Sequence, residues 1–152
     1  MMTYNLEEWN TFYIDFLPLW DGGHLEESRA MEYAEKHVFD ASRYCLLDQA
    51  GILVITTARD DAKLCGYFVT LCDVHLNLAD LKTASPPLYY LHPDYRGKGI
   101  GGELIRFTEN VLRKRGVELF SVGVKTYLPY APVFDHLGYR EVESVYIKRL
   151  DF

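Results

Sequence analysis

The sequence lacks the features that mark membrane and secreted proteins. It has no apolar run of about 20 residues, the length that a membrane-spanning helix needs. Its first residues, Met1-Met2-Thr3-Tyr4-Asn5, carry no basic segment of the kind that opens a signal peptide. We therefore expect a cytoplasmic protein that does not enter a membrane.

The chain also lacks an excess of basic residues. Its formal net charge is −6 at pH 7, whereas a protein that binds nucleic acid needs a positive surface to meet the phosphates. The balance argues against nucleic acid as a partner. It is compatible with a cationic substrate such as an amine, although most acidic surfaces only keep a protein soluble.

Cysteine is scarce. Cys45, Cys65 and Cys72 are an odd number of thiols without the spacing of metal ligands, so no metal site is predicted. Cys65 and Cys72 stand in an apolar, strand-like stretch. We expect buried, reduced thiols, which fits a reducing compartment.

The residues that are present suit one domain, spanning 1–152, with one sizeable core, since 49% of them are hydrophobic. The N-terminal third has helical patterns. Apolar and aromatic residues recur at helical spacing from Leu6 to Trp20, behind a capping box at Asn5 and Glu8. We expect Pro18 and the Asp21-Gly22-Gly23 turn to end this helix, and two further helices over 26–37 and 41–50.

The period of the pattern then changes to that of strands. Strands are expected over 52–58, 64–72, 88–92, 118–124 and 139–150. The polar turn 59–63 predicts an antiparallel hairpin, and 73–87 is expected to be an irregular loop. With helices over 99–115 and 131–137, the order predicts an α/β or α+β-like fold: a mixed central sheet flanked by helices.

One stretch, 88–102, joins a strand to a helix through a loop rich in glycine. Pro93 ends the apolar run, four glycines follow, and the amphipathic helix begins. Free N–H groups and the helix dipole make such a helix start attractive to anions. Glycines also let a phosphate approach the backbone closely.

Two common phosphate loops fit this stretch poorly. A Walker A loop requires Ser or Thr after the lysine, but Gly99 follows Lys98. Gly97, Gly99 and Gly102 do satisfy the G-x-G-x-x-G pattern of dinucleotide-binding loops. However, only about fifty residues follow the loop, too few for the rest of a doubly wound sheet.

The stretch 92–101 resembles the acyl-CoA binding motif R/Q-x-x-G-x-G/A of the GNAT N-acetyltransferase superfamily. Arg96, Gly99 and Gly101 stand at the three motif positions, and 134–139 resembles the short helix that ends in Gly-Phe or Gly-Tyr in this family. The resemblance covers roughly the last hundred residues. The first fifty depart from it, since no N-terminal strand is evident there.

A narrower resemblance concerns small GNAT proteins that are often encoded by phages and prophages. Four short motifs carry it: Thr57-Ala58-Arg59-Asp60, Gly66-Tyr67, Tyr90-Leu91-His92-Pro93, and the C-terminal set Tyr146, Lys148 and Leu150. The natural substrates of such proteins are generally unassigned, so this resemblance does not identify the acceptor.

The resemblance implies that acetyl-CoA, the acyl donor, lies between two parallel strands that splay apart, 89–92 and 119–124. It assigns these residues to the cofactor: Leu91, His92, Arg96, Gly97, Lys98, Gly99, Ile100, Gly101 and Gly102. The backbone N–H groups of the loop would hold the pyrophosphate. The N–H of Leu91 would polarise the thioester carbonyl, a contribution of about 3–4 kcal/mol for one such donor.

The resemblance implies transfer of an acetyl group to a primary amine and allows a homodimer, but it leaves the catalytic residues open. His75 and Tyr90 are candidates for the base. The tyrosine that many members use as the acid is replaced by Phe134, so Tyr127 and Tyr130 are candidates, with Tyr130 preferred. The alternative is a catalytically degenerate module that binds CoA or a protein partner.

Overall fold

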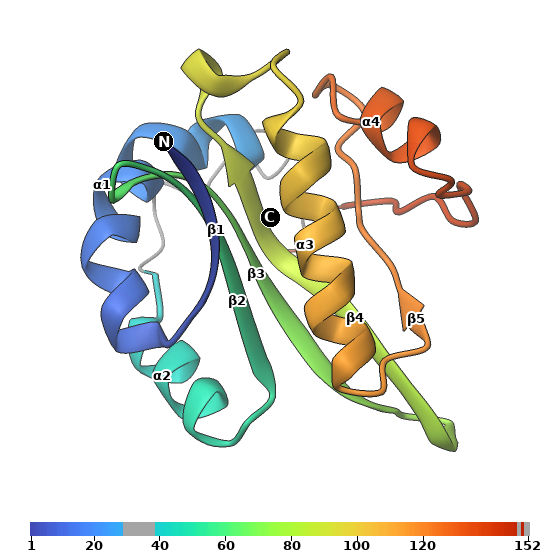
Figure 1. Cartoon of the computed structure of the whole chain (residues 1–152). Coiled ribbons are helices and arrows are strands. Elements are labelled where there is room, and N and C mark those ends of the chain that lie inside the picture. Colours follow the sequence, from blue (N-terminus) through green and yellow to red (C-terminus); the bar gives the residue numbers. More distant parts are fainter. Residues whose placement is uncertain (29–38, 149, 151–152) are drawn as a thin grey trace.

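The computed structural model describes residues 1–28, 39–148 and 150 (Figure 1). In chain order the elements are β1 Met2–Glu7, α1 Trp9–Ser28, α2 Ala41–Gln49, β2 Leu53–Asp60, β3 Lys63–His75, β4 Leu78–Leu91, a 3-10 turn Pro93–Tyr95, α3 Ile100–Lys114, β5 Leu119–Phe120 and α4 Ala131–His136. None of the described helices is both long and apolar enough to span a membrane.

The described strands form one five-stranded sheet in the order β1-β2-β3-β4-β5. β1 to β4 are antiparallel neighbours, whereas β5 runs parallel to β4. The crossover that parallel neighbours require is α3, which connects β4 to β5. The mixed sheet with flanking helices confirms the expected fold class.

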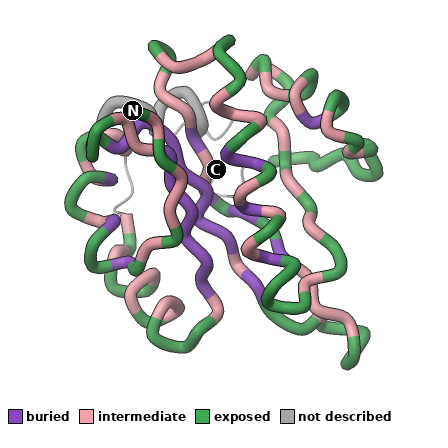
Figure 2. The backbone as a smooth tube through the Cα atoms, viewed as in Figure 1, coloured by how far each residue is buried: buried purple, intermediate pink, exposed green. Residues whose placement is uncertain are grey.

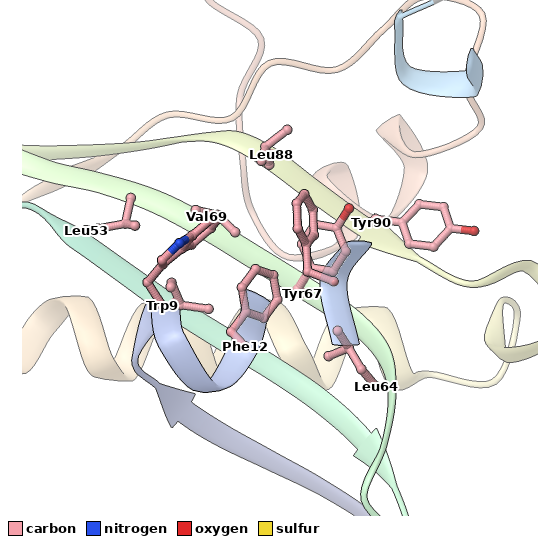
Figure 3. Packing of buried hydrophobic residues seen from close by; sticks show 10 residues of the cluster. Trp9, Phe12, Leu53, Leu64, Tyr67, Val69, Leu88 and Tyr90 are labelled. Carbon is pink, nitrogen blue, oxygen red and sulfur yellow. The ribbon is translucent and has the colours of Figure 1, made fainter. Parts of the chain in front are cut away.

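One face of the sheet is covered by α1 and α2. Helix α1 contributes Trp9, Phe12 and Phe16, each at most 2% exposed. They pack with Tyr67 and Val69 of β3 (Figure 3). The aromatic stripe of the first helix is therefore core, and Figure 2 shows buried residues along the central strands of the sheet.

The opposite face is covered by α3 and α4. Leu104 and Ile105 of α3 and Phe134 of α4 pack with Ala58 and Phe68 of the sheet. Helix α3 is strongly amphipathic, so its polar residues face solvent while this apolar stripe meets the strands. This packing fixes the start of α3 relative to the end of β4.

The prediction of a helix from Leu6 was wrong. Residues 2–7 form β1, which pairs with β2 along its whole length, and α1 begins only at Trp9. The capping box is not formed: Asn5 bonds Thr3, and the first N–H of the helix, that of Trp9, donates to Asp48 of α2. Pairing with a distant strand outweighed the local helical spacing.

The expected stop at Pro18 and residues 21–23 was also wrong, because α1 continues to Ser28. Proline removes the bond to the carbonyl four residues earlier, that of Ile14. Ile14 is 72% exposed, so water can solvate that carbonyl. The expected helix 26–37 begins inside α1, and its remainder, 29–37, lies outside the described residues.

The stretch 73–87 is not an irregular loop. β3 continues to His75 and β4 begins at Leu78, so most of these residues form a long hairpin. Its tip is exposed at Leu76. Val74, Leu76 and Leu78 do alternate with polar residues as in a strand, but Pro86 and Pro87 argue against a strand over the whole stretch. The first hairpin, β2–β3, confirms the antiparallel pair expected around the turn 59–63.

The last two expected strands also differ from the structure. Only Leu119 and Phe120 of 118–124 are assigned to a strand. The described residues of 140–150 form no strand and are all exposed. Alternating polarity alone did not give a strand there, because a strand also needs a paired neighbour.

The cysteines behave largely as expected. Cys65 and Cys72 are buried free thiols, and Cys45 is a half-buried one. Burial raises the pKa of both Cys65 and Cys72. The protonated thiol is a poor nucleophile, so these two side chains contribute to packing.

Candidate functional site

The site begins where β4 and β5 part. They pair at Thr83–Leu119 and Ala84–Phe120, and the N–H of Ser121 donates to the carbonyl of Ala84 at 3.0 Å. Beyond this point β4 runs on to Leu91, whereas the described chain after Phe120 forms no further strand pairs with it. We call the two unpaired stretches, 85–91 and 121–124, the fork.

Two consecutive prolines account for the fork. Val69 pairs with Leu88 and Leu71 pairs with Ser85, so Pro86 and Pro87 together oppose the single residue Thr70. This is a β-bulge, which bends and twists the strand that carries the extra residue. Neither proline has an N–H to donate to a neighbouring strand, so β4 turns away from β5 at this point.

The loop after β4 is tightly held. The N–H of His92 donates to the carbonyl of Cys65 at 2.8 Å, which ties the loop to β3. The imidazole Nδ1 of His92 accepts from the N–H of Asp94 and so starts the 3-10 turn. His92 therefore has a structural role at the entry to the loop.

Helix α3 then begins without a side-chain cap. Gly99 is the cap residue, and no side chain bonds the first turn. The first bond of the helix runs from the N–H of Glu103 to the carbonyl of Gly99. The N–H groups of Ile100, Gly101 and Gly102 precede it, so this end of the helix has the donors and the positive potential that an anion requires.

The loop depends on glycine for its conformation. Gly97 and Gly99 have φ angles of 75° and 81°, which other residues adopt at a cost of about 1–2 kcal/mol. At Gly101 a Cβ would meet the Leu91 side chain at 3.6 Å, an ordinary contact. The geometry therefore requires glycine most strongly at positions 97 and 99.

Leu91 faces the fork with its backbone. His92 bonds to β3, and successive residues of an antiparallel strand point their backbone groups to opposite sides. The N–H and C=O of Leu91 are therefore directed away from β3. The carbonyl accepts a bond of 2.8 Å from Nε of Arg96, which agrees with this direction.

Arg96 brings two of the predicted catalytic residues together. Its guanidinium lies 5.7 Å from the ring centre of Tyr90 and 5.4 Å from that of Tyr130. Tyr90 comes from β4 and is buried, whereas Tyr130 is half-buried and precedes α4. Sequence segments 40 residues apart thus meet at the end of β4.

His75 is not part of this group. It ends β3 at the tip of the long hairpin, where it pairs with Leu78. Gly66, the partner of Leu91, lies nine residues earlier on the same strand, a separation of about 30 Å. The structure therefore separates His75 from the loop and from the other two candidates.

Phe134 stands in the core of the C-terminal part. It is 6% exposed and contacts the rings of Tyr89 and Tyr139 edge-on. It has no proton to donate. Tyr130, one turn earlier in the chain, is the tyrosine that contacts Arg96, while Tyr127 lies in the preceding turn that Leu128 closes onto Lys125.

Two polar side chains support the loop from outside. The hydroxyl of Tyr95 donates to Asp60 at the end of β2 over 3.0 Å. This bond raises the pKa of Tyr95 and lowers that of Asp60. Lys98 is exposed and bonds the carbonyl of Asp94, so its ammonium remains at the surface of the loop.

The sequence pattern singles out neither Tyr89 nor the proline bulge. Tyr89 fits the strand expected over 88–92, and only the fold shows that its hydroxyl donates to the carbonyl of Gly123 across the fork. The adjacent Pro86 and Pro87 were the available signal for the bulge. They were interpreted as a loop because two prolines are rare inside a strand.

Comparison with known proteins places the chain in one family. Residues 9–139 match the model of a family described as acetyltransferase (GNAT) family. A search of curated proteins found no match.

Several solved structures share the fold. An aminoglycoside acetyltransferase from an uncultured soil metagenomic sample, in complex with sisomicin, is 16% identical with a TM-score of 0.71, covering 97% of this chain and 96% of its own. A ribosomal-protein-alanine N-acetyltransferase from Brucella melitensis is 20% identical with a TM-score of 0.67, covering 99% of both chains. A predicted acetyltransferase with acetyl-CoA from Clostridium acetobutylicum is 13% identical with a TM-score of 0.69, covering 99% and 97%.

Proposed function

Because the chain belongs to the acetyltransferase (GNAT) family, we propose that it transfers the acetyl group of acetyl-CoA to a primary amine. The observation that carries the proposal is the start of α3, where three backbone N–H groups follow a glycine cap beside the open end of β4. Such a helix start suits the pyrophosphate of CoA. One similar structure contains acetyl-CoA, and two others are named for aminoglycoside and ribosomal-protein acceptors.

In the proposed complex the loop holds the pyrophosphate and the fork holds the pantetheine arm. Leu91, His92, Arg96, Gly97, Lys98, Gly99, Ile100, Gly101 and Gly102 form the cofactor site. The outward N–H of Leu91 would donate to the thioester carbonyl and stabilise the negative charge that develops on its oxygen. Arg96 would then have to share or release the Leu91 carbonyl as pantetheine enters.

The acetyl group would pass directly to the amine. The nitrogen forms a bond to the acetyl carbon, the carbon–sulfur bond breaks, and CoA leaves as a thiolate that takes up a proton. A covalent route through cysteine is disfavoured because Cys65 and Cys72 are buried with raised pKa values. The described fold offers them no role in the transfer.

Proton transfers would fall to the two tyrosines beside Arg96. An alkyl amine with a pKa of about 10.4 is mostly protonated at pH 7, so it must lose a proton before it attacks. Tyr90 is our candidate for that step, directly or through water, and Tyr130 for returning a proton to the thiolate. We leave His75 out of the proposed site.

Thiol release from acetyl-CoA tests the proposal. The panel would include an aminoglycoside, a polyamine and a peptide with an N-terminal alanine. We expect release with at least one class, and its loss in a Gly99→Val, Gly101→Val double variant. Absence of release with every amine, despite tight binding of CoA, would support the second candidate.

That second candidate is a non-catalytic GNAT module that binds CoA or a protein partner. The buried Phe134 at the usual acid position favours it. The aromatic face of α1 does not, since Trp9, Phe12 and Phe16 are covered by the sheet and offer no partner surface.

Other aspects of the protein remain predictions. These are the narrower phage or prophage subgroup, the cytoplasmic location, the absence of nucleic acid among the partners, the single-domain organisation and the homodimer. Analytical ultracentrifugation at several concentrations would test the last of these.

A further inference from the structure

The two sides of the fork are joined by a side chain where backbone pairing has stopped. Tyr89 lies on β4, five residues past the last β4 residue that pairs with β5. Its hydroxyl donates to the carbonyl of Gly123 on the other side, at 2.5 Å. This bond crosses the fork at the level where the pantetheine arm is proposed to lie.

The ring that carries this hydroxyl is held on three sides. It stacks on Phe68 of β3, with ring centres 5.2 Å apart and planes 9° apart. It also meets Phe134 of α4 edge-on at 6.1 Å and Tyr130 at 5.9 Å. A ring fixed by β3, β4 and α4 presents its hydroxyl in one place, so the bond costs little further ordering.

The segment that accepts the bond has less support of its own. Residues 121–124 belong to no described strand or helix, and Ser121 and Gly123 are exposed. Val122 and Val124 are only half-buried against the packing between the sheet, α3 and α4. Gly123 lies two residues beyond the last backbone bond to β4, so the Tyr89 hydroxyl is placed to fix this segment.

We propose that Tyr89 is a positioning residue that holds residues 121–124 at a fixed separation from β4 and so preforms the site of the pantetheine arm. The proposal rests on the function proposed above for this fork. It predicts an effect on ligands that contain pantetheine, and none on ligands that occupy only the loop and the start of α3. A role in general stability would weaken both kinds of ligand alike.

The chain offers a matched control. The hydroxyl of Tyr139 donates to Oε2 of Glu109 on α3 at 2.9 Å. Its ring also contacts Phe134, so it belongs to the same cluster. Its hydrogen bond does not cross the fork. Tyr139→Phe and Tyr89→Phe each remove one phenolic hydroxyl and the hydrogen bond that it donates. The acceptor of Tyr139 is a carboxylate, so its bond is at least as strong as that of Tyr89, and only Tyr89→Phe removes a connection between the two sides of the fork.

The experiment measures two affinities by calorimetry for each protein. One ligand is CoA, and the other is 3′-phosphoadenosine 5′-diphosphate, which lacks the pantetheine arm. We expect Tyr89→Phe to weaken CoA binding about three- to tenfold, the value of one hydrogen bond. It should change binding of the truncated ligand less than about twofold. Tyr139→Phe should leave both affinities within about twofold of the unmodified protein.

Equal weakening of both ligands in Tyr89→Phe, or unchanged CoA affinity, would overturn the proposal. So would a loss of CoA affinity in Tyr139→Phe as large as that in Tyr89→Phe.

Backbone 15N relaxation without ligand tests the connection independently of the function. We expect lower order parameters for the amides of Val122 to Val124 in Tyr89→Phe and no such change in Tyr139→Phe. Unchanged order parameters would overturn the positioning role. If the order parameters fall but neither the unmodified protein nor Tyr89→Phe binds CoA, the proposed function fails, and with it the pantetheine part of the proposal, while the structural connection stands.

Discussion

The loop 92–99 and the side chains around Arg96 are neighbours, yet the chain builds them in different ways. The loop works through its backbone: positive φ angles at Gly97 and Gly99, and N–H groups at the start of α3. The group around Arg96 works through side chains from β4, the loop and the turn before α4. Backbone sites can therefore be recognised from one short stretch, whereas side-chain sites depend on the tertiary fold.

The sharpest test of this difference is a pair of glycine substitutions. Gly99 and Gly51 have similar φ angles, 81° and 73°, and at neither would a Cβ meet an atom within 4 Å. Gly99→Val and Gly51→Val should therefore cost similar stability. We expect Gly99→Val to weaken acetyl-CoA binding by about a hundredfold or more, because valine disfavours the positive φ of Gly99 and so shifts the N–H groups at the start of α3.

Calorimetry and thermal unfolding of both variants make the comparison. Gly51 lies in the α2–β2 connection, at the opposite end of the sheet from the start of α3 and its loop (Figure 1), so Gly51→Val should keep the affinity of the unmodified protein. If both variants bind acetyl-CoA equally well, the loop backbone does not form the site.

Tyr130→Phe tests the group of side chains around Arg96. If Tyr130 returns the proton to the leaving thiolate, kcat should fall by about ten- to a hundredfold. This is at or below the lower end of the usual effect of a general acid, because a thiolate leaves readily. The KM for acetyl-CoA should change little, since the loop is intact. Steady-state kinetics with the best amine of the panel would measure both.

Tyr127→Phe is the control for that experiment. It removes the same group from the neighbouring turn, and we expect near-normal kcat. Equal activity of Tyr130→Phe and the unmodified protein would instead leave solvent as the proton source.

A substitution in the sheet outside the candidate site, at Thr70 of β3, should change stability alone. The hydroxyl of Thr70 is buried and has no hydrogen-bond partner among the described residues, opposite the proline bulge. Thr70→Val keeps the shape of the side chain and removes the unsatisfied group. We expect the free energy of unfolding to rise by about 1 kcal/mol with acetyl-CoA affinity unchanged.

Urea unfolding would measure this gain in stability, and Thr56→Val is the control variant. The hydroxyl of Thr56 bonds that of Thr108 at 2.6 Å in the core, so removing the Thr56 hydroxyl should destabilise the protein. A loss of stability in Thr70→Val would mean that the hydroxyl has a partner in solution.

Lys98→Ala should have the smallest effect. The ammonium already bonds a backbone carbonyl at the exposed surface of the loop, so it adds little to a phosphate held by the backbone. We expect a two- to threefold weaker affinity for acetyl-CoA at low salt, disappearing at high salt. A loss comparable to that of Gly99→Val would show that side-chain charge, and not backbone geometry, holds the pyrophosphate.

Local patterns predicted most of the fold, and long-range contacts account for the errors. The antiparallel hairpin, α3, α4 and the parallel crossover follow from periodicity, glycines and connection order. β1 was missed because its strand character comes from pairing with β2, and Leu6 fits a helical spacing equally well. The long β3–β4 hairpin was missed because Pro86 and Pro87 argue against a strand, and the short alternation of Val74, Leu76 and Leu78 did not outweigh them.

The residues of the candidate site also differ in whether local sequence or long-range contacts determine their role. The loop residues were predictable because their role depends on local geometry. Tyr90 and Tyr130 were candidates by position, but only the fold shows that Arg96 lies between them. His75 had an equally plausible position in the sequence, and only the register of β3 with β4 reveals its distance from the loop.

The central claim is that the backbone at the start of α3 binds the pyrophosphate of acetyl-CoA. NMR titration of the 15N-labelled protein tests it most directly, because a bound phosphate shifts the resonances of the amides that donate hydrogen bonds to it. We expect the largest shifts at Ile100, Gly101 and Gly102, with the amides of Gly51 and Gly116 unmoved. Saturable binding of acetyl-CoA without shifts at those three amides, or no binding at millimolar concentration, would contradict it.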